Sequence, residues 1–408
     1  MSTLLGYLSA FTDTKQPRVY SFSTSVQSTL TFKAVAKQAQ VLRNQYSRAA
    51  GAKVALTLTA SAESLINLVA LDGFVEELVL LPVDQALPQG CHYHLTERGH
   101  LRMLNEFAGN ALPVHTQWGL LDEQDHLIEY YLDDLANNEL VATGDRQDPL
   151  RWGVLQEPSE LAGLLVWLRA LRAGEDIVLA QADSLAALLD LFTQAEVTAI
   201  AAPPRLWRNF IATAEISRLP LRLAVVNGGI ADAPTLNRLQ SIFPAALVVH
   251  SFSNTGVGIS WLITDGKPGL PAELFEPGEN KVLLEVENDN QLVIEFTGTG
   301  AAINTGYLTQ RDDSGRVVIT GHIDNQMNVG GRVVLPEQVE QTILKVQGVS
   351  DVQASSMPND VLGELIRVDV LAPDFRTVAA RKELKRTLQE HCREHLEPWQ
   401  RPARYYFY

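Results

Sequence analysis

Cysteine and basic side chains are scarce in this sequence, and each shortage excludes a class of protein. The two cysteines, Cys91 and Cys392, lie far apart in the 408-residue chain, so they give neither a disulfide framework nor the close spacing of a zinc site. A reducing compartment fits this cysteine usage, and we expect a cytoplasmic protein. The 33 basic residues stand against 48 acidic ones, and the formal charge of −15 disfavours a nucleic-acid-binding protein because it repels polyanions.

Long apolar runs are also missing, which disfavours a membrane protein. The longest stretches, such as 161–171, are interrupted by Gly163 and Arg169 and fall short of the roughly 20 residues that a membrane span needs. The first residues lack a basic region followed by an apolar core, so we expect no signal peptide. With 46% hydrophobic residues, the chain can bury a large core and is expected to hold more than one domain.

The first 150 residues predict a mixed α/β unit. Apolar residues recur at helical spacing in Phe32–Asn44 and Ala62–Leu71, and an apolar run follows each of them, at 53–59 and 77–84. Helices that alternate with strands predict parallel pairing. Residues 91–150 are weakly patterned, and their histidines are interpreted as surface or hydrogen-bonded side chains, with no metal site: His92, His94, His100, His115 and His126.

From residue 151 the alternation of helix and strand is regular. A helix is predicted over Leu161–Leu171, with Ser159 as its N-cap and Gly174 as its C-cap. Strands preceded by helices are predicted at Asp176–Ala180, Val197–Ala201, Leu221–Val226 and Ala246–His250. This order predicts a second doubly wound sheet, whose ligands bind beyond the carboxyl ends of the strands. The segments expected there are 227–229 and 250–258.

The hydrophobic period changes to two after residue 258. Lys281–Val286 and Gln291–Phe296 predict a hairpin, and 315–320 predicts a further strand of a small antiparallel or barrel-like subdomain. Beyond residue 324 the pattern predicts an α+β module. Its last helix, Val378–Leu396, is expected to bury a stripe made of Leu384, Leu388, Cys392 and Leu396.

A motif lies at the start of this last module. Gly321-His322-Ile-Asp324-Asn-Gln-Met-Asn328-Val-Gly330-Gly331 is followed shortly by Pro336-Glu-Gln-Val-Glu340. The segment resembles the hinge motif of the adenylate-forming superfamily, G-R-x-D-x-x-x-K-x-x-G followed by P-x-E-[IV]-E. That superfamily contains AMP-dependent synthetases and ligases such as acyl- and aryl-CoA synthetases, luciferases and the adenylation domains of peptide synthetases.

The resemblance covers nearly the whole chain and implies an acetyl-CoA synthetase-like α/β fold. A large adenylation-like domain, 1–323, would contain two doubly wound α/β subdomains, 1–150 and 151–265, and a β subdomain, 266–323. A hinge would lead to a small α+β domain, 324–408, shorter than in the superfamily. Arg151-Trp152-Gly153 and Asp265-Gly266-Lys267 resemble a branch of acyl-CoA synthetase-like proteins from bacterial biosynthetic clusters.

The resemblance also implies where a ligand site lies. Asn227-Gly228-Gly229 stands where a glycine pair shapes the acyl and adenine pocket, and Phe252-Ser253-Asn254-Thr255 stands where an aromatic residue precedes x-[ST]-T-E. His322 and Asp324 occupy the hinge. Gly330 and Gly331 would border the approach of a CoA or carrier-protein arm.

Several residues that bind ATP in the superfamily are absent from the corresponding positions of this sequence. The string nearest to its phosphate loop, T-S-G-[ST]-T-G-x-P-K, is 141–149, which has one glycine, two aspartates and no lysine. Gly256 stands in place of a magnesium-binding glutamate, Tyr307 in place of a ribose-binding aspartate and His322 in place of the hinge arginine. The sequence stops before the motif with the adenylating lysine. Because one preorganised contact of this kind contributes about 2 to 4 kcal/mol, we expect these losses to slow adenylation by orders of magnitude.

The C-terminal segment 376–408 reverses the sign of the charge, with eight basic and four acidic side chains. Lys382, Lys385 and Arg386 are candidates for a patch that attracts an acidic partner such as an acyl carrier protein. A solvated helix face explains the same charges without any partner.

Three functions remain open from the sequence. The first is a catalytically degenerate relative that binds an acyl or aryl carboxylate, a carrier protein or a full-length synthetase in a biosynthetic pathway. The second is an active acyl- or aryl-CoA or carrier-protein ligase with a rebuilt nucleotide site, in which Asn227, Asn254, Thr255 and Lys267 are substitute contacts. Only this alternative requires ATP, Mg²⁺ and CoA. The third is a structural subunit of a biosynthetic complex. No catalytic residue is identified, and no metal site is expected.

Overall fold

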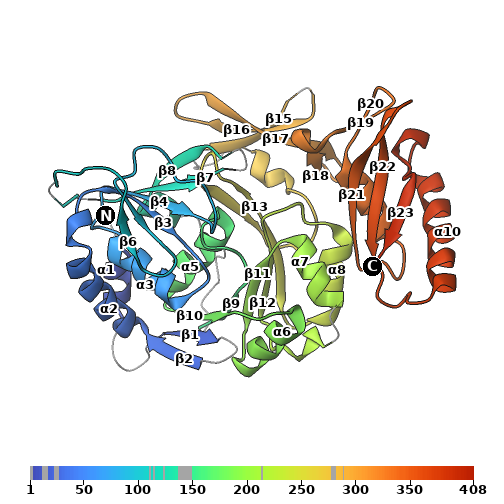
Figure 1. The fold of residues 1–408 in the computed structure, drawn as a ribbon. Coiled ribbons are helices and arrows are strands. Elements are labelled where there is room, and N and C mark those ends of the chain that lie inside the picture. The colour runs from blue at the N-terminus through green and yellow to red at the C-terminus, as the bar shows by residue number, and fades with distance from the viewer. Residues whose placement is uncertain are drawn as a thin grey trace. The chain divides into compact units, whose positions relative to one another are not determined.

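The computed structural model describes residues 3–11, 17–22, 27–109, 112–113, 115–122, 125–136, 149–212, 215–276, 282–287 and 289–408. The chain divides into two compact units, drawn with the rest of the chain in Figure 1. Unit 1 comprises Met1–Ala202, Glu215–Gly228 and Ile242–Thr264, and unit 2 comprises Pro203–Ala214, Gly229–Ser241 and Asp265–Tyr408. No helix in these ranges is long and apolar enough to cross a membrane.

The first sheet of unit 1 has six strands in the order β6-β5-β3-β4-β7-β8. They are β3 (Lys53–Thr57), β4 (Glu77–Leu81), β5 (Tyr93–Leu95), β6 (Leu101–Met103), β7 (Gln117–Leu121) and β8 (Leu127–Tyr131). The predicted parallel pairing of β3 with β4 is confirmed. The weakly patterned stretch after residue 90 adds two antiparallel pairs, β5 with β6 and β7 with β8, so the sheet is mixed.

The helical segments of this part of unit 1 are α1 (Leu4–Ser9), α2 (Phe32–Gln45), η1 (Ser47–Ala49), α3 (Ala62–Leu71) and α4 (Leu132–Ala136). Hydroxyl side chains cap the N-termini of α1, α2 and α3. The side chains of Thr31 and Ser61 accept hydrogen bonds from the backbone N–H groups of Ala34 and Ser64, which satisfies donors that the first turn leaves unpaired. The predicted helices 32–44 and 62–71 are thereby confirmed.

The second sheet of unit 1 has eight strands in the order β14-β13-β12-β11-β9-β10-β1-β2. They are β1 (Arg18–Phe22), β2 (Gln27–Thr31), β9 (Arg151–Val154), β10 (Asp176–Ala180), β11 (Ala199–Ala202), β12 (Leu223–Val226), β13 (Leu247–Asn254) and β14 (Ile259–Ile263). The four strands predicted after residue 175 are confirmed as β10 to β13. The edge strands β2 and β14 are antiparallel to their neighbours, whereas the interior strands are parallel.

The helix α5 (Leu161–Ala173) corrects one prediction and confirms another. Gly174 ends it in the left-handed conformation at φ 67°, as expected for a C-cap glycine. Ser159 is not its N-cap, because a turn closed by the Glu160 N–H and the Glu157 carbonyl places Glu160 there. The remaining helices of this stretch are α6 (Leu185–Gln194) and η2 (Ile216–Arg218) in unit 1, and α7 (Pro204–Ala212) and α8 (Ala233–Ile242) in unit 2.

One continuous hydrophobic core joins the two sheets of unit 1. It contains the fully buried Trp118 of β7, Trp152 of β9 and Trp167 of α5. Interiors of this kind are packed as densely as organic crystals, so they hold the attached strands rigidly. The carboxyl ends of β12 and β13 are therefore fixed in place.

Unit 2 begins with an antiparallel sheet in the order β15-β16-β17-β18. The strands are β15 (Val282–Val286), β16 (Gln291–Phe296), β17 (Ala301–Arg311) and β18 (Val317–His322), and η3 (Ala272–Phe275) precedes them. The predicted hairpin of β15 with β16 is confirmed. The long strand β17 was not predicted, and register shifts interrupt its pairing with β16 and β18.

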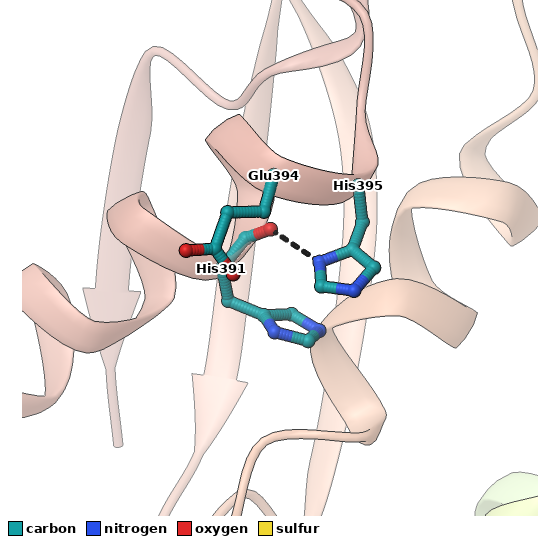
Figure 2. Close-up of side chains that lie close together, drawn as sticks. All are labelled: His391, Glu394 and His395. Atoms are coloured by element: carbon teal, nitrogen blue, oxygen red, sulfur yellow. Dashed lines mark hydrogen bonds between the residues drawn. The ribbon is translucent and has the colours of Figure 1, made fainter.

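The C-terminal part of unit 2 is a five-stranded sheet with two helices. The strands are β19 (Met327–Val329), β20 (Arg332–Val334), β21 (Asp351–Asn359), β22 (Gly363–Leu371) and β23 (Arg404–Phe407); the helical segments are η4 (Ile323–Asn325), α9 (Pro336–Leu344), α10 (Val378–His395) and η5 (Pro398–Gln400). Helix α10 buries Leu384, Leu388 and Cys392, as predicted. Its last turn carries His391, Glu394 and His395, which lie close together (Figure 2).

Candidate ligand site

The carboxyl ends of β12 and β13 place two polar side chains next to each other. In the parallel pairing of these strands, Val226 stands opposite His250. Asn227 follows Val226, and its N–H donates to the Ala202 carbonyl at 3.0 Å, so the backbone stays in the ladder. Asn227 is therefore beside Ser251, and the two side chains point to the same face of the sheet.

Both side chains are buried without a hydrogen-bond partner in the described part of the chain. Asn227 is 1% exposed and neither of its amide atoms is paired, and Ser251 is 4% exposed with an unpaired Oγ. A buried polar group without a partner costs about 1 to 3 kcal/mol. Native proteins leave few such groups unless water or a ligand satisfies them, so this face is suited to a ligand with complementary donors and acceptors.

Strand β13 is longer than predicted, which corrects the place of three candidates. Phe252, Ser253 and Asn254 lie within the strand, not beyond its end, because β14 folds back and pairs with them. Ser253 Oγ and Ser260 Oγ, on the face shared by Asn227 and Ser251, are 2.9 Å apart. Thr255 begins the turn to β14.

The opposite face of β13 carries aromatic rings and a third side chain with an unpaired atom. Phe252 and Trp261 stack with ring centroids 5.7 Å apart. The Oδ1 atom of Asn254 is buried and has no partner among the described residues. A Cβ atom added at Gly256 would lie 3.1 Å from Asn254 Oδ1, so a side chain at 256 would press on Asn254.

Tyr130 of β8 packs against the turn between β13 and β14. A Cβ atom at Gly258 would lie 2.5 Å from the Tyr130 ring, so this position requires glycine. The Tyr130 hydroxyl is buried and unpaired within the described residues, and burial raises the pKa of Tyr130. The unpaired groups at this edge are thus amides and hydroxyls that are uncharged at neutral pH. They can hydrogen-bond a carbonyl or carboxylate, but they offer no positive charge to a triphosphate.

The candidate residues of the β subdomain contact each other in unit 2. The rings of Tyr307 and His322 meet edge to face with centroids 4.9 Å apart. His322 Nε2 lies 3.2 Å from the Thr305 carbonyl, which can only accept, and Nδ1 accepts from the Asp324 N–H at 3.3 Å. In the neutral form of the ring these contacts place the proton on Nε2, and Nδ1 also lies 3.6 Å from the Asp324 carboxylate. Gly306, at φ +75°, leaves the space that this ring fills.

Gly330 and Gly331 form the turn between β19 and β20, with φ of 60° and 79°. The Gly330 N–H donates to the Leu362 carbonyl and the Gly331 N–H to Asn328 Oδ1, both at 2.9 Å. A Cβ atom at Gly331 would meet nothing within 4 Å, so the outer side of this turn is open.

The basic candidates lie along α10 but do not share one environment. Lys382 is exposed, Lys385 Nζ lies 6.0 Å from the centroid of the Tyr405 ring, and Arg386 pairs with Glu390 at 3.4 Å. Arg386 is therefore partly neutralised within its own helix. The string nearest in sequence to the superfamily's phosphate loop, 141–149, lies outside the described residues except for Pro149.

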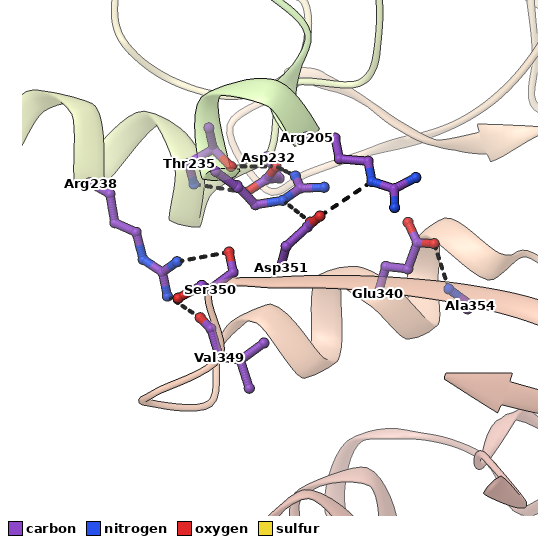
Figure 3. A network of polar contacts seen from close by, with 10 residues as sticks. Arg205, Asp232, Thr235, Arg238, Glu340, Val349, Ser350, Asp351 and Ala354 are labelled. Atoms are coloured by element: carbon purple, nitrogen blue, oxygen red, sulfur yellow. Dashed lines mark hydrogen bonds and ion pairs between the residues drawn. The ribbon is translucent and has the colours of Figure 1, made fainter. Parts of the chain in front are cut away.

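A buried ion network in unit 2 was not predicted from the sequence (Figure 3). Arg208 of α7 donates from Nη1 to Asp232 at 2.8 Å and from Nε to Asp351 at 2.6 Å. The three side chains are at most 8% exposed. Nearby, the pKa of Glu340 is raised to about 7, first because the carboxyl group is buried. Because Arg208 and Asp351 are 143 residues apart in sequence, no local sequence pattern indicates that they pair.

A pocket of about 710 Å³ in unit 1 was also missed. It lies between α2, α3 and the turn after β5, and it is lined by apolar side chains that include Val41, Leu42 and Ile66. Tyr46 donates to Asn67 Oδ1 at 2.9 Å beside them. Val41 at this pocket is 52% exposed, and no pattern in the sequence indicates that exposure.

Comparison with known proteins agrees with this fold. No protein-family model matches the chain. The anthranilate CoA ligase AuaEII, solved in complex with anthranoyl-AMP, superposes with a TM-score of 0.75 at 15% identity over 100% of this chain and 93% of that one. Unliganded O-succinylbenzoate CoA synthetase from Bacillus subtilis gives 0.72 at 15% identity over 100% and 99%. The chain therefore has the fold of adenylate-forming acyl-CoA synthetases, with a small C-terminal module.

Curated relatives are acyl- and aryl-CoA, AMP and carrier-protein ligases. A 3-[(3aS,4S,7aS)-7a-methyl-1,5-dioxo-octahydro-1H-inden-4-yl]propanoyl:CoA ligase of Mycobacterium tuberculosis is 26% identical over 43% of this chain and 39% of its own length. The 2,3-dihydroxybenzoate-AMP ligase of Bacillus subtilis is 32% identical over 31% and 23%. The fatty acid–[acyl-carrier-protein] ligase MmaC of Mycobacterium marinum is 29% identical over 25% and 19%. The matches span about two fifths of these relatives or less, and they confirm the predicted resemblance.

Proposed function

We propose that the protein binds an acyl or aryl carboxylate at the carboxyl ends of β12 and β13, and that it lacks efficient ATP chemistry. The observation that carries this proposal is the pair of buried side chains, Asn227 and Ser251, which lie on one face of adjacent strands and have no partner among the residues that the structure describes. An amide and a hydroxyl can donate to carboxylate oxygens and accept from a substituent hydroxyl. The AMP-ligase-like fold and its ligase relatives support this class of ligand.

Two local features support the loss of nucleotide chemistry. At the position of the magnesium-binding glutamate, Gly256 leaves room that Asn254 occupies. At the position of the ribose-binding aspartate, Tyr307 offers a phenol whose ring packs on the His322 imidazole. A carboxylate accepts hydrogen bonds from two hydroxyl groups at once, and a metal ion prefers anionic oxygen ligands. Tyr307 therefore does not replace the ribose-binding aspartate, and Gly256 does not replace the metal ligand.

Calorimetric titration tests the binding site. We expect 2,3-dihydroxybenzoate or decanoate to bind the purified full chain, and MgATP to produce no pyrophosphate with either acid. Asn227→Ala is expected to weaken binding about tenfold or more, since one hydrogen bond to a charged group contributes about 1.5 to 3 kcal/mol. Asn44→Ala, on the exposed side of α2, is the matched control. Equal affinity in both variants would contradict the assignment of Asn227.

We further propose that 324–408 acts as the small domain of the superfamily in the cytoplasm, with Asp324 at the hinge and Gly330 and Gly331 facing a carrier arm. The open space outside Gly331 supports this role. Lys382, Lys385 and Arg386 would attract an acidic acyl carrier protein. Reversing all three to glutamate is expected to abolish capture of a purified acyl carrier protein at low salt, whereas reversing Arg98, Arg102 and Lys37 of unit 1 leaves capture unchanged. Equal capture by the α10 variant would refute the patch.

A further inference from the structure

The last turn of α10 brings two imidazoles and a carboxylate together (Figure 2). His391, Glu394 and His395 follow the spacing i, i+3 and i+4, which places side chains on one helix face. One possible ligand atom from each lies within 4.8 Å of the others. Within the described ranges, which include every histidine of the sequence, no other group of three His, Cys, Asp or Glu side chains meets this condition.

The hydrogen bonding of His395 leaves one nitrogen ready to bind a metal. Its Nδ1 lies 2.9 Å from the His391 carbonyl oxygen. A carbonyl oxygen only accepts, so Nδ1 carries the proton and the lone pair of the neutral ring is on Nε2. Metal-binding histidines commonly show this arrangement, in which a backbone carbonyl fixes the tautomer and orients the ring.

The surroundings of the three groups differ in a way that suits a preorganised site. His391 is half-buried, its buried Nε2 has no hydrogen-bond partner among the described residues, and the backbone of Thr342 interacts with its ring. Its ring stacks on that of His395 with centroids 4.1 Å apart. Glu394 and His395 are exposed and free to adjust. His391 can thus act as the fixed member, and the other two side chains can close on a metal that it holds.

We propose that His391, Glu394 and His395 form a binding site for Zn²⁺. Two imidazole nitrogens and one carboxylate oxygen are a donor set that zinc takes with a water molecule in the fourth position. Ligand atoms about 2.0 to 2.1 Å from a tetrahedral zinc are roughly 3.3 Å apart, so modest rotation of the exposed Glu394 and His395 side chains completes the geometry. The site is independent of the ligand edge at β12 and β13.

Zinc at this place would bridge residues one helical turn apart, His391 with Glu394 and His395. It therefore stabilises the end of α10, whose Leu388 and Cys392 pack in the core of the C-terminal sheet. Lys345, after α9, is close enough for its charge to act on His391. A nearby cation opposes metal binding, so we expect a site of micromolar affinity and not the tight site of a zinc finger.

Titration of the EDTA-treated full chain with ZnCl₂ tests the proposal. We expect one saturable site, and a loss of affinity of about tenfold or more in His395→Ala, because one of three protein ligands is removed. Glu394→Gln is expected to lose affinity as well. His100→Ala, an exposed histidine of unit 1, is the control and is expected to bind like the parent chain.

Binding of Co²⁺ gives a second, spectroscopic readout of the same site. Co²⁺ at the parent site is expected to develop visible absorption bands of a four-coordinate ion, and Zn²⁺ is expected to displace it. His395 and Glu394 are exposed, so their variants fold even if His391→Ala does not. Absence of saturable binding, or equal zinc affinity in His395→Ala and His100→Ala, would overturn the proposal.

Discussion

Replacing Ser251 with alanine tests whether the unpaired hydroxyl at the β12–β13 edge lowers the stability of the ligand-free protein and strengthens ligand binding. The Ser251 hydroxyl is buried and has no partner in the described residues. Removing it abolishes the cost of burying an unpaired group, about 1 to 3 kcal/mol, and leaves almost no cavity. We therefore expect Ser251→Ala to stabilise the ligand-free protein by about 1 kcal/mol or more, and to weaken binding of 2,3-dihydroxybenzoate or decanoate.

Ser64→Ala is the matched control, because the substitution and the burial are the same. Ser64 is 1% exposed, but its Oγ accepts from the Thr59 N–H at 3.1 Å. Its removal leaves that donor unpaired and is expected to destabilise the protein by about 1 to 3 kcal/mol. Thermal unfolding measures both, since 1 kcal/mol shifts the midpoint of a domain of this size by about 2 to 4 °C. Destabilisation of similar size in both variants would refute the reasoning.

Three further predictions concern unit 2. The pKa of Glu340 is raised from 4.5 to about 7, first by burial. Between these pH values the native state holds more protons than the unfolded chain, so the free energy of unfolding falls as the pH rises. Glu340→Gln is expected to flatten this part of the pH profile of stability measured by urea unfolding. Arg208→Met leaves two carboxylates buried and is expected to lower the free energy of unfolding by about 3 to 5 kcal/mol. Arg205→Met, at a side chain 52% exposed, is expected to lower it by less than about 1 kcal/mol. Equal losses in the two variants would contradict the network. Gly306→Ala places a Cβ atom 2.3 Å from His322 Nε2, whereas Gly300→Ala, at a similar φ of 67°, meets nothing within 4 Å; the unfolding midpoint is expected to drop more for Gly306→Ala, and the same drop in both variants would show that only the backbone matters.

Much of the fold could be predicted because its strongest signals are local. The helices α2, α3 and α10 have apolar residues at helical spacing, and Gly174 ends α5 with the conformation that favours glycine. The three-residue strands β5 and β6 are too short to show a period. The N-cap of α5 was placed one residue early, because the turn that sets it depends on a backbone hydrogen bond and not on the Ser159 side chain.

The positions of the candidate residues in the fold were partly predictable, but their surroundings were not. Motif spacing predicted that Asn227 and the 250–258 segment follow strands. In the structure Asn227 and the turn from Thr255 follow strands, whereas residues up to Asn254 lie within β13. The sequence could not show that Ser251 is buried and unpaired, or that β14 extends β13 to Asn254. Both depend on register between segments distant in sequence. The contact of Tyr307 with His322 depends in the same way on the pairing of β17 with β18.

The most direct test of the central claim is the formation of AMP from MgATP by the purified full chain, measured by chromatography with 2,3-dihydroxybenzoate or decanoate present at saturating concentration. The ligand-binding account predicts that AMP stays at the level of a protein-free blank, although the acid is bound. Acid-dependent AMP formation above that blank, lost on heating the protein, would contradict it.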